Sequence, residues 1–254
     1  MRRQSPVLKT LAAAVFWLLV WTALAKLVNR ELLLPAPPAV LRRFMELALT
    51  AEFWRTIALT LLRIACGVLA AVCLGTLAAA LTERFVLADC LLRPLLSVIR
   101  STPVASFIIL ALLWMGRDIL PGFISALMVL PVVWANVGAG VRETDRDLLE
   151  VARVFHFSRG KTLRYVYIPS VLPYFLSACK SSIGLGWKAG VAAEVLTVPA
   201  LSIGRMLYES KLYLETADLF AWTAAVILCS LLIEKLVMAA VGRLSAKRGR
   251  EAAA

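Results

Sequence analysis

Long apolar segments alternate with short polar segments along the chain, and six of the apolar segments are long enough to cross a membrane as helices. The predicted spans are Leu11–Val28, Thr56–Leu81, Leu95–Met115, Ile119–Gly140, Ser170–Leu196 and Ala217–Val241. At about 1.5 Å per residue, a helix over Thr56–Leu81 exceeds a hydrocarbon core of roughly 30 Å, so it can cross with some tilt. The pattern predicts an all-α integral membrane protein. We expect residues 1–254 to form one transmembrane domain with its core at residues 56–241.

Segments of other character separate the predicted spans. Pro35-Ala36-Pro37-Pro38 indicates a loop, because proline lacks the backbone N–H that a helix interior needs. An amphipathic pattern then predicts a short helix over Ala39–Glu52 at the outer surface. We expect a polar turn over Thr82–Pro94, an interruption of the third span at Ser101-Thr102-Pro103, and a polar outer segment over Thr197–Thr216.

The longest strongly polar segment is residues 141–169, between the fourth and fifth predicted spans. Thr144 is the expected N-cap of a first helix, and Asp147 stands three residues later, where it would complete a capping box. The predicted apolar stripe of this helix is Leu148, Leu149, Ala152 and Phe155, opposite Asp147, Glu150 and Arg153. The pattern breaks at Ser158-Arg159-Gly160, and a second helix is expected to end at Pro169.

Glu150-Val151-Ala152, followed by Ile168-Pro169 with the proline nineteen residues after the glutamate, resembles the EAA loop of bacterial ABC-importer permeases. The resemblance implies coupling helices that sit in a cleft of a separate ATPase subunit. The implied ATPase-coupling residues are Leu149, Glu150, Ala152, Arg153, Phe155, His156, Ile168 and Pro169. Val151 departs from the family alanine, and His156 stands where the family usually has glycine, which disfavours a left-handed turn there. A generic amphipathic loop on the membrane surface is the alternative.

Two further stretches resemble the same family. Arg100-Ser101-Thr102-Pro103 is similar to the R-x-x-P run that opens its third span. Gly184-Leu185-Gly186-Trp187, leading to Ala192-Ala193-Glu194, resembles the nitrate/sulfonate/taurine-type branch. The resemblance covers nearly the whole chain and implies a type I importer permease fold, an ATPase dimer as the partner that hydrolyses ATP, and an extracytoplasmic solute-binding protein. A single docking loop favours a permease homodimer. The chain has no G-x-x-x-x-G-K-[ST] loop, so we expect it to bind no cofactor and to hydrolyse no ATP itself.

The fifth predicted span is unusual because it contains charged residues. Lys180, Gly184 and Lys188 are four residues apart and therefore share one helix face. Charge within a bilayer core normally faces a partner or a water-filled cavity, so we expect this face to border a translocation path for an anionic solute. The predicted path residues are Lys180, Gly184, Lys188 and Glu194. In the structural alternative, Lys188 pairs with Glu194 or another buried acid and Lys180 extends toward the interface.

Composition and charge agree with a membrane location. The chain is 61% hydrophobic with a mean hydropathy of +0.83, far above the apolar share of a soluble domain. The basic residues behind the net charge of +12 mostly flank the spans, which the positive-inside rule and anionic lipids explain without nucleic acid. Fifteen of the 28 lie on the predicted inner side and eight on the outer side, which places both termini in the cytoplasm. With no C-x-x-C pair and His156 as the only histidine, we expect no metal site.

Three alternatives remain open. Residues 11–28 could be a signal peptide cleaved near Ala23-Leu24-Ala25, although an uncleaved first span is favoured. The chain could be the membrane scaffold of an energy-coupling-factor vitamin importer, but Ala152-Arg153 is only a fragment of that family's A-R-G motif. A membrane-embedded enzyme would need converging polar groups within the spans. The favoured hypothesis is a permease subunit of an ABC importer in a bacterial cytoplasmic membrane.

Overall fold

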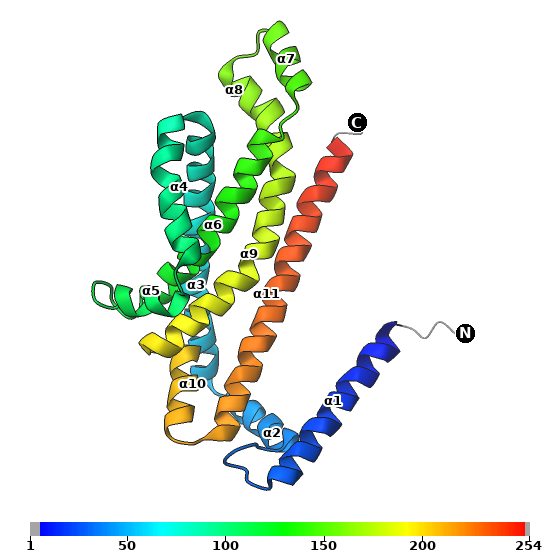
Figure 1. The fold of residues 1–254 in the computed structure, drawn as a ribbon. Coiled ribbons are helices and arrows are strands. Elements are labelled where there is room, and N and C mark those ends of the chain that lie inside the picture. Colours follow the sequence, from blue (N-terminus) through cyan, green and yellow to red (C-terminus); the bar gives the residue numbers. More distant parts are fainter. Residues whose placement is uncertain (1–5, 252–254) are drawn as a thin grey trace.

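The computed structural model describes the backbone of residues 6–251 and the side chains of residues 11–243, and this part of the chain is helical without strands (Figure 1). Its elements are α1 (Pro6–Val28), α2 (Pro37–Ala48), α3 (Ala51–Arg84), α4 (Val86–Ser101), α5 (Val104–Ala111), α6 (Leu120–Arg142), α7 (Arg146–Val154), α8 (Arg159–Thr162), the π-helix η1 (Leu163–Tyr167), α9 (Ile168–Thr197), α10 (Ile203–Leu212) and α11 (Thr216–Glu251). The predicted basic tails lie largely outside the described side chains.

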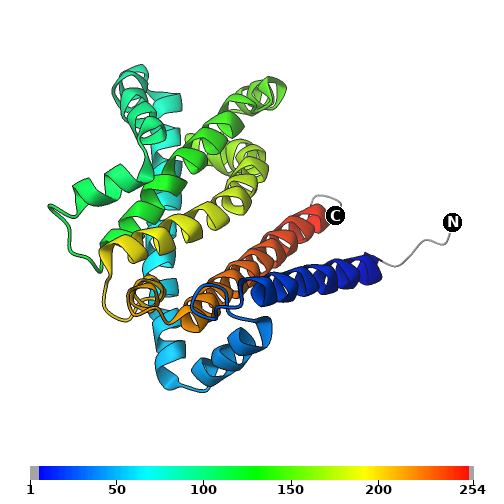
Figure 2. The same cartoon turned by 60° about the horizontal axis from the view of Figure 1, so that its bottom comes forward.

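Three long helices make the centre of the bundle, with α6 packed along both α3 and α9 (Figures 1 and 2). The crossing of α3 and α6 is very close at Gly67 and Gly122. A Cβ atom added to Gly67 would lie 1.9 Å from the carbonyl oxygen of Gly122. Only glycine permits this approach, and small residues at such crossings are typical of helices that associate within a membrane.

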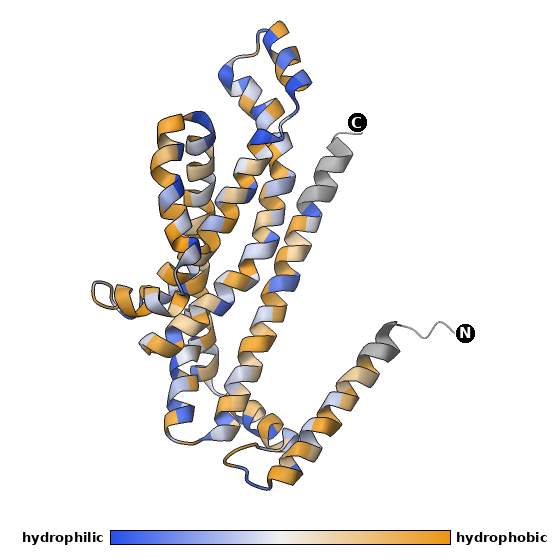
Figure 3. Cartoon of the chain, in the orientation of Figure 1, coloured by the Kyte–Doolittle hydropathy of each residue, from blue (hydrophilic) through white to orange (hydrophobic). Residues whose placement is uncertain are grey.

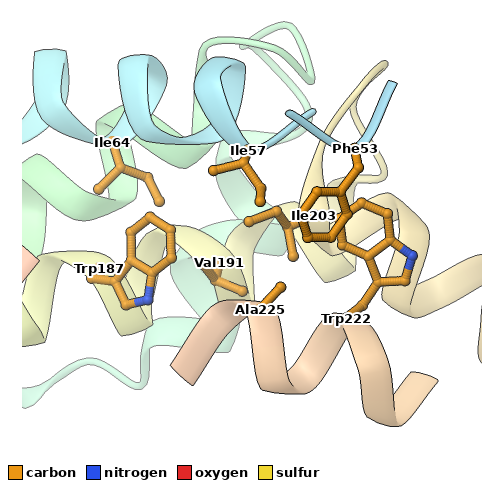
Figure 4. Close-up of a cluster of buried hydrophobic side chains, with 8 residues drawn as sticks. All are labelled: Phe53, Ile57, Ile64, Trp187, Val191, Ile203, Trp222 and Ala225. Carbon is orange, nitrogen blue, oxygen red and sulfur yellow. The ribbon is translucent and has the colours of Figure 1, made fainter. Parts of the chain in front are cut away.

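Aromatic and branched side chains fill the core where α3, α9, α10 and α11 meet (Figure 4). The ring centroids of Phe53 and Trp222 are 4.9 Å apart, and Ile203 is fully buried beside them. The helix α2 covers this end of the bundle and is fixed to α11 by an ion pair in which Arg43 Nη2 lies 2.8 Å from Asp218 Oδ2. Arg43 and Arg42 also hold the pKa of the Glu46 carboxyl on α2 below its usual range.

The helix α1 stands apart from the bundle and approaches the other helices mainly at its C-terminal end, near α2 (Figures 1 and 2). Trp21 stacks on Phe220 at the start of α11, with 5.6 Å between the ring centroids. The side chains of Trp17, Leu19 and Leu27 are more than half exposed. A helix whose surface is apolar on all sides is suited to lipid or to a neighbouring apolar helix.

Four helices in the described part are long and apolar enough to cross a membrane: α1, α3, α6 and α11. The pair α4 and α5 makes a fifth candidate if the two count as one bent span. The helix α9 has the length of a span but includes the charged residues Lys180, Lys188 and Glu194. The all-helical prediction is confirmed, and the count of six spans stays a prediction. Hydrophobic residues cover the long helices, and hydrophilic ones gather at α7 and α8 (Figure 3).

The predicted third span is wrong in its bounds. Helix already begins at Val86, so the polar turn expected over Thr82–Pro94 is a single residue, Phe85, between α3 and α4. The predicted interruption at Ser101-Thr102-Pro103 is a bend of 105° between α4 and α5. Proline pushes the preceding residue out of the helical region, and Thr102 has a ψ of 130°. Within the outer segment over Thr197–Thr216, residues Ile203–Leu212 form α10.

Candidate coupling loop and translocation face

The loop between α6 and α9 projects beyond the rest of the bundle, at the opposite end from α2 and α10 (Figure 1). Its first helix, α7, is capped by Asp145, whose carboxylate accepts a hydrogen bond of 2.9 Å from the Asp147 backbone N–H. The expected capping box at Thr144 is therefore wrong. Thr144 is buried and its hydroxyl donates to the Gly140 carbonyl, so it closes α6 instead of opening α7.

The end of α7 forms a left-handed turn at His156, which has a φ of 49°. The Phe157 N–H donates to the Ala152 carbonyl at 2.8 Å, and the His156 N–H donates to the Arg153 carbonyl at 3.0 Å. These two bonds define a Schellman motif, in which glycine is usual at the left-handed position. The left-handed turn is thus present although histidine disfavours it. The two hydrogen bonds offset the steric cost of the left-handed backbone at His156.

The two sides of α7 meet different surroundings. Leu149, Ala152 and Arg153 line a cavity of about 880 Å³ between the loop and the ends of α3, α6 and α9. Arg153 therefore shares a side with Leu149 and Ala152, contrary to the prediction that it lies opposite them. The outward side consists of Leu148, Val151, Val154 and Phe155.

This outward apolar side was only partly anticipated. Val154 and Phe155 are 74% and 71% exposed, and Leu148 and Val151 are about half exposed. Phe155 is among the predicted ATPase-coupling residues, whereas Leu148, Val151 and Val154 are not. Leu148, Val151 and Phe155 recur at the i, i+3 and i+7 positions of a helix, so the spacing marks them as an apolar stripe but does not say which side of α7 faces outward. Glu150 is exposed, as its predicted role in a polar contact requires.

The second half of the loop leads into α9 without a break. The predicted helix end at Pro169 is wrong, because η1 joins α9 directly and Pro169 lies in the first turn of α9. That position tolerates proline, since the first N–H groups of a helix have no partner within it. Ile168 is half exposed and lines the same cavity as Leu149, so it faces the inside of the loop.

The three residues of the predicted lysine face lie together on α9. Lys180 and Lys188 are exposed and Gly184 is half buried. A Cβ atom added to Gly184 would meet open space. Within the described side chains neither lysine forms an ion pair. In the monomer this face is thus free to border another surface or a solute.

Glu194 lies away from the lysine face and is fully buried. Its Oε2 atom accepts hydrogen bonds from the Thr60 hydroxyl at 3.0 Å and from the Gly204 N–H at 3.1 Å. Its Oε1 atom is 3.7 Å from Arg63 Nη1. The pairing of Lys188 with Glu194, proposed as the structural alternative, is therefore replaced by a pairing with Arg63 of α3.

Arg63 extends this network across the end of the bundle. Its guanidinium donates to the carbonyls of Ala200 at 2.8 Å and Leu201 at 3.2 Å, and its Nη2 lies 3.0 Å from Asp118 Oδ1. Arg63 was identifiable in the sequence as a charge within a span, but its partners are more than fifty residues away. The network joins α3, the segment between α9 and α10, and the segment before α6.

Comparison with known proteins identifies similar chains. Residues 71–250 match the family described as binding-protein-dependent transport system inner membrane component. SsuC of Bacillus subtilis, provisionally described as an aliphatic sulfonates transport permease, is 28% identical over 80% of this chain and 74% of its own length. The taurine transport system permease TauC of Escherichia coli is 25% identical over 93% of this chain and 88% of its own length. The nitrate import permease NrtB of Leptolyngbya laminosa is 32% identical over 62% of this chain and 56% of its own length.

A solved structure has a similar fold. A chain of an amino acid ABC transporter, crystallised with histidines, aligns with a TM-score of 0.55 at 20% identity, covering 74% of this chain and 90% of that one. At this identity the match concerns the fold alone. It agrees with the helical architecture described above.

Proposed function

Because the chain belongs to the family of binding-protein-dependent transport inner membrane components, and is thus a permease subunit of an ABC importer, we propose that it passes a small anion along the lysine face of α9. Family membership implies an ATPase and a solute-binding protein as partners and a location in the inner membrane. None of the matched relatives supports the energy-coupling-factor alternative.

Two exposed lysines of α9, which form no ion pair among the side chains that the structure describes, are the observation behind the proposed substrate class. A lysine that faces lipid within the bilayer core costs a few kcal/mol or more, so we expect Lys180 and Lys188 to face water or an anion. Gly184 between them leaves room for a solute. The relatives are named for sulfonates, taurine, bicarbonate and nitrate, solutes that bear a small anionic group. We infer a solute of the same class for this chain. In this proposal Glu194 stabilises the packing of α9 against α3 and α10 through its contacts with Thr60, Arg63 and Gly204.

The outward side of α7 supports a docking role for the loop. Four exposed apolar side chains on α7 and its C-cap are unfavourable in water, and we infer that they contact a protein. We propose that Leu148, Val151, Val154 and Phe155 enter a cleft of the ATPase and that Glu150 contacts its rim. In this proposal the chain binds no cofactor and catalyses no reaction, ATP is hydrolysed by the ATPase dimer, and both termini are cytoplasmic. Since the described residues contain one such loop, we propose that two copies of the chain engage the two ATPase subunits.

Uptake measurements test the proposed path. Cells that lack their own copy would receive wild type, Lys188→Met or Lys211→Met, and labelled taurine, an alkyl sulfonate, nitrate and bicarbonate would be supplied in turn. Lys211 is an exposed lysine on α10, at one end of the bundle, and is the matched control. We expect Lys188→Met to reduce uptake of the transported anion by at least about tenfold, since a desolvated charge contact is worth on the order of 1.5–3 kcal/mol. Unchanged uptake and half-saturation in Lys188→Met would exclude the path.

A pull-down tests the docking role separately. Tagged protein would be isolated from native membranes in mild detergent, and its partners identified by mass spectrometry. Glu150→Lys and Val154→Asp are expected to lose the ATPase. Glu31→Lys makes the same charge reversal at an exposed residue between α1 and α2, at the other end of the bundle, and should retain it (Figure 1). Glu31, like Glu150, forms no ion pair among the described side chains. Loss of the ATPase in all three variants, or in none, contradicts the docking surface.

A further inference from the structure

The cavity beneath the coupling loop has a lining that separates into two parts. Its floor is largely apolar and consists of side chains from the ends of α3, α6 and α9, which include Ala80, Val137, Val141, Leu172 and Phe175. Its rim includes three arginines, namely Arg84 at the end of α3, Arg153 on α7 and Arg159 on α8. A pocket with an apolar floor and a cationic rim matches an amphiphile with an anionic head.

The three rim arginines lack acidic partners within the described side chains. The one acid in the lining, Glu83, forms an ion pair with Arg142. Arg84, Arg153 and Arg159 are all exposed, so their charges are available to a ligand. Guanidinium groups bind phosphate oxygens in bidentate geometry, which makes a phosphate head the best match for this rim.

The position of the cavity favours a lipid over a soluble anion. Its lining comes from the ends of α3, α6 and α9 and from the loop. Hydrophobic residues on the long helices give way there to hydrophilic residues on α7 and α8 (Figure 3), and we infer that this is the level of the lipid headgroups. We propose that one anionic glycerophospholipid of the inner leaflet binds here, with its phosphate on the arginines and an acyl chain on the floor.

Such a lipid would contact both the loop and the bundle. Leu149 and Phe157 contribute to the cavity from the loop, and Phe175 contributes from α9, so an acyl chain between them would brace α7 against the bundle. This consequence rests on the proposed coupling role of α7. The binding itself does not, and it can be measured on the permease alone.

The test uses the full-length chain in neutral detergent without its ATPase. Phosphatidylglycerol, phosphatidylcholine of the same acyl length, and glycerol 3-phosphate would be titrated separately, with bound ligand counted by native mass spectrometry. The double variant Arg153→Gln/Arg159→Gln removes two rim charges. Lys161→Gln/Arg164→Gln removes two exposed charges of the same loop that do not line the cavity, and is the matched control.

We expect wild type to bind phosphatidylglycerol in preference to phosphatidylcholine and to bind glycerol 3-phosphate weakly. The rim variant should bind phosphatidylglycerol on the order of tenfold to thirtyfold more weakly, because each arginine near a headgroup contributes about 1 kcal/mol. The control variant should bind like wild type, and both should unfold at the wild-type temperature. Equal weakening in both variants, no preference between the two lipids, or equal binding of glycerol 3-phosphate would each overturn the proposal. The rim variant would also be carried through the pull-down from native membranes described above, and loss of the ATPase there with phosphatidylglycerol binding intact would assign the cavity to the ATPase instead.

Discussion

Removing the Glu194 carboxylate tests whether the buried network holds α10 and the segment after α9 in place. Glu194→Ala removes two hydrogen bonds and leaves the Gly204 N–H and the facing side of Arg63 without their partner. Breaking a buried ion pair by deleting one member costs about 3–5 kcal/mol. We therefore expect Glu194→Ala to lower the free energy of unfolding by about that amount. This corresponds to a fall of roughly 6–20 °C in the unfolding temperature of a chain of this size.

Glu194→Gln should be milder, because the amide oxygen can still accept from Thr60 and Gly204 while the attraction to Arg63 at 3.7 Å is lost. We expect a loss of about 1–2 kcal/mol for this variant. Glu209→Gln is the matched control, since Glu209 forms a partly exposed ion pair with Arg205 on α10 and should change stability by less than about 1 kcal/mol. Unfolding in detergent would be followed by fluorescence, with the buried Trp187 and Trp222 as reporters.

The same variants separate the framework role from the predicted path role of Glu194. If the framework role holds, Glu194→Ala is much less stable than wild type, and Glu194→Gln transports in proportion to the folded protein that remains. An unfolding temperature for Glu194→Ala no lower than that of Glu209→Gln would refute the reasoning. A stable Glu194→Gln that has lost transport would instead support the path prediction.

Three further changes have expected outcomes. Gly67→Ala should destabilise the bundle by about 1–3 kcal/mol or more, because the new methyl would lie 1.9 Å from the Gly122 carbonyl oxygen, whereas Gly184→Ala enters open space and should unfold like wild type. His156→Gly should raise the free energy of unfolding by roughly 0.5–1 kcal/mol, because glycine adopts the left-handed turn without the steric cost, and His156→Ala should give no such gain. Val154→Asp should leave the free energy of unfolding within about 0.5 kcal/mol of wild type while abolishing ATPase co-purification, because its side chain is 74% exposed; a matching loss of stability would point to misfolding instead.

Much of the fold follows from local pattern. The centres of α3, α6 and α11 were predictable because a predominantly apolar run of about twenty residues is typical of a transmembrane helix. The two-part coupling loop was predictable from its alternation of apolar and charged residues. The start of α4 was not, because an amphipathic helix beginning at Val86 has the composition of a polar turn followed by a span. The sequence predicts the break at Pro103 but not the angle of 105° between α4 and α5.

The candidate site divides in the same way. The lysine face followed from helical spacing alone, since four-residue steps fix which side chains share a side. The partner of Glu194 could not be inferred, because Arg63 lies more than a hundred residues earlier and meets it only after α3 and α9 have packed. The orientation of α7 was equally inaccessible, because both of its sides include apolar residues and only packing decides which side the bundle covers.

Continuity of the backbone between α7 and α9 gives the proposed coupling a physical route. The Schellman turn ties His156 and Phe157 to the last turn of α7 through one backbone hydrogen bond each, and α8, η1 and α9 then follow one another with no intervening loop. A helix transmits displacement along its axis, so a shift of α7 toward a partner would move the start of α9. Lys180 and Lys188 are part of that same helix. A rigid turn at His156 is therefore as necessary to the proposed mechanism as the docking surface, and a variant that loosens it should uncouple ATP hydrolysis from uptake while retaining both partners.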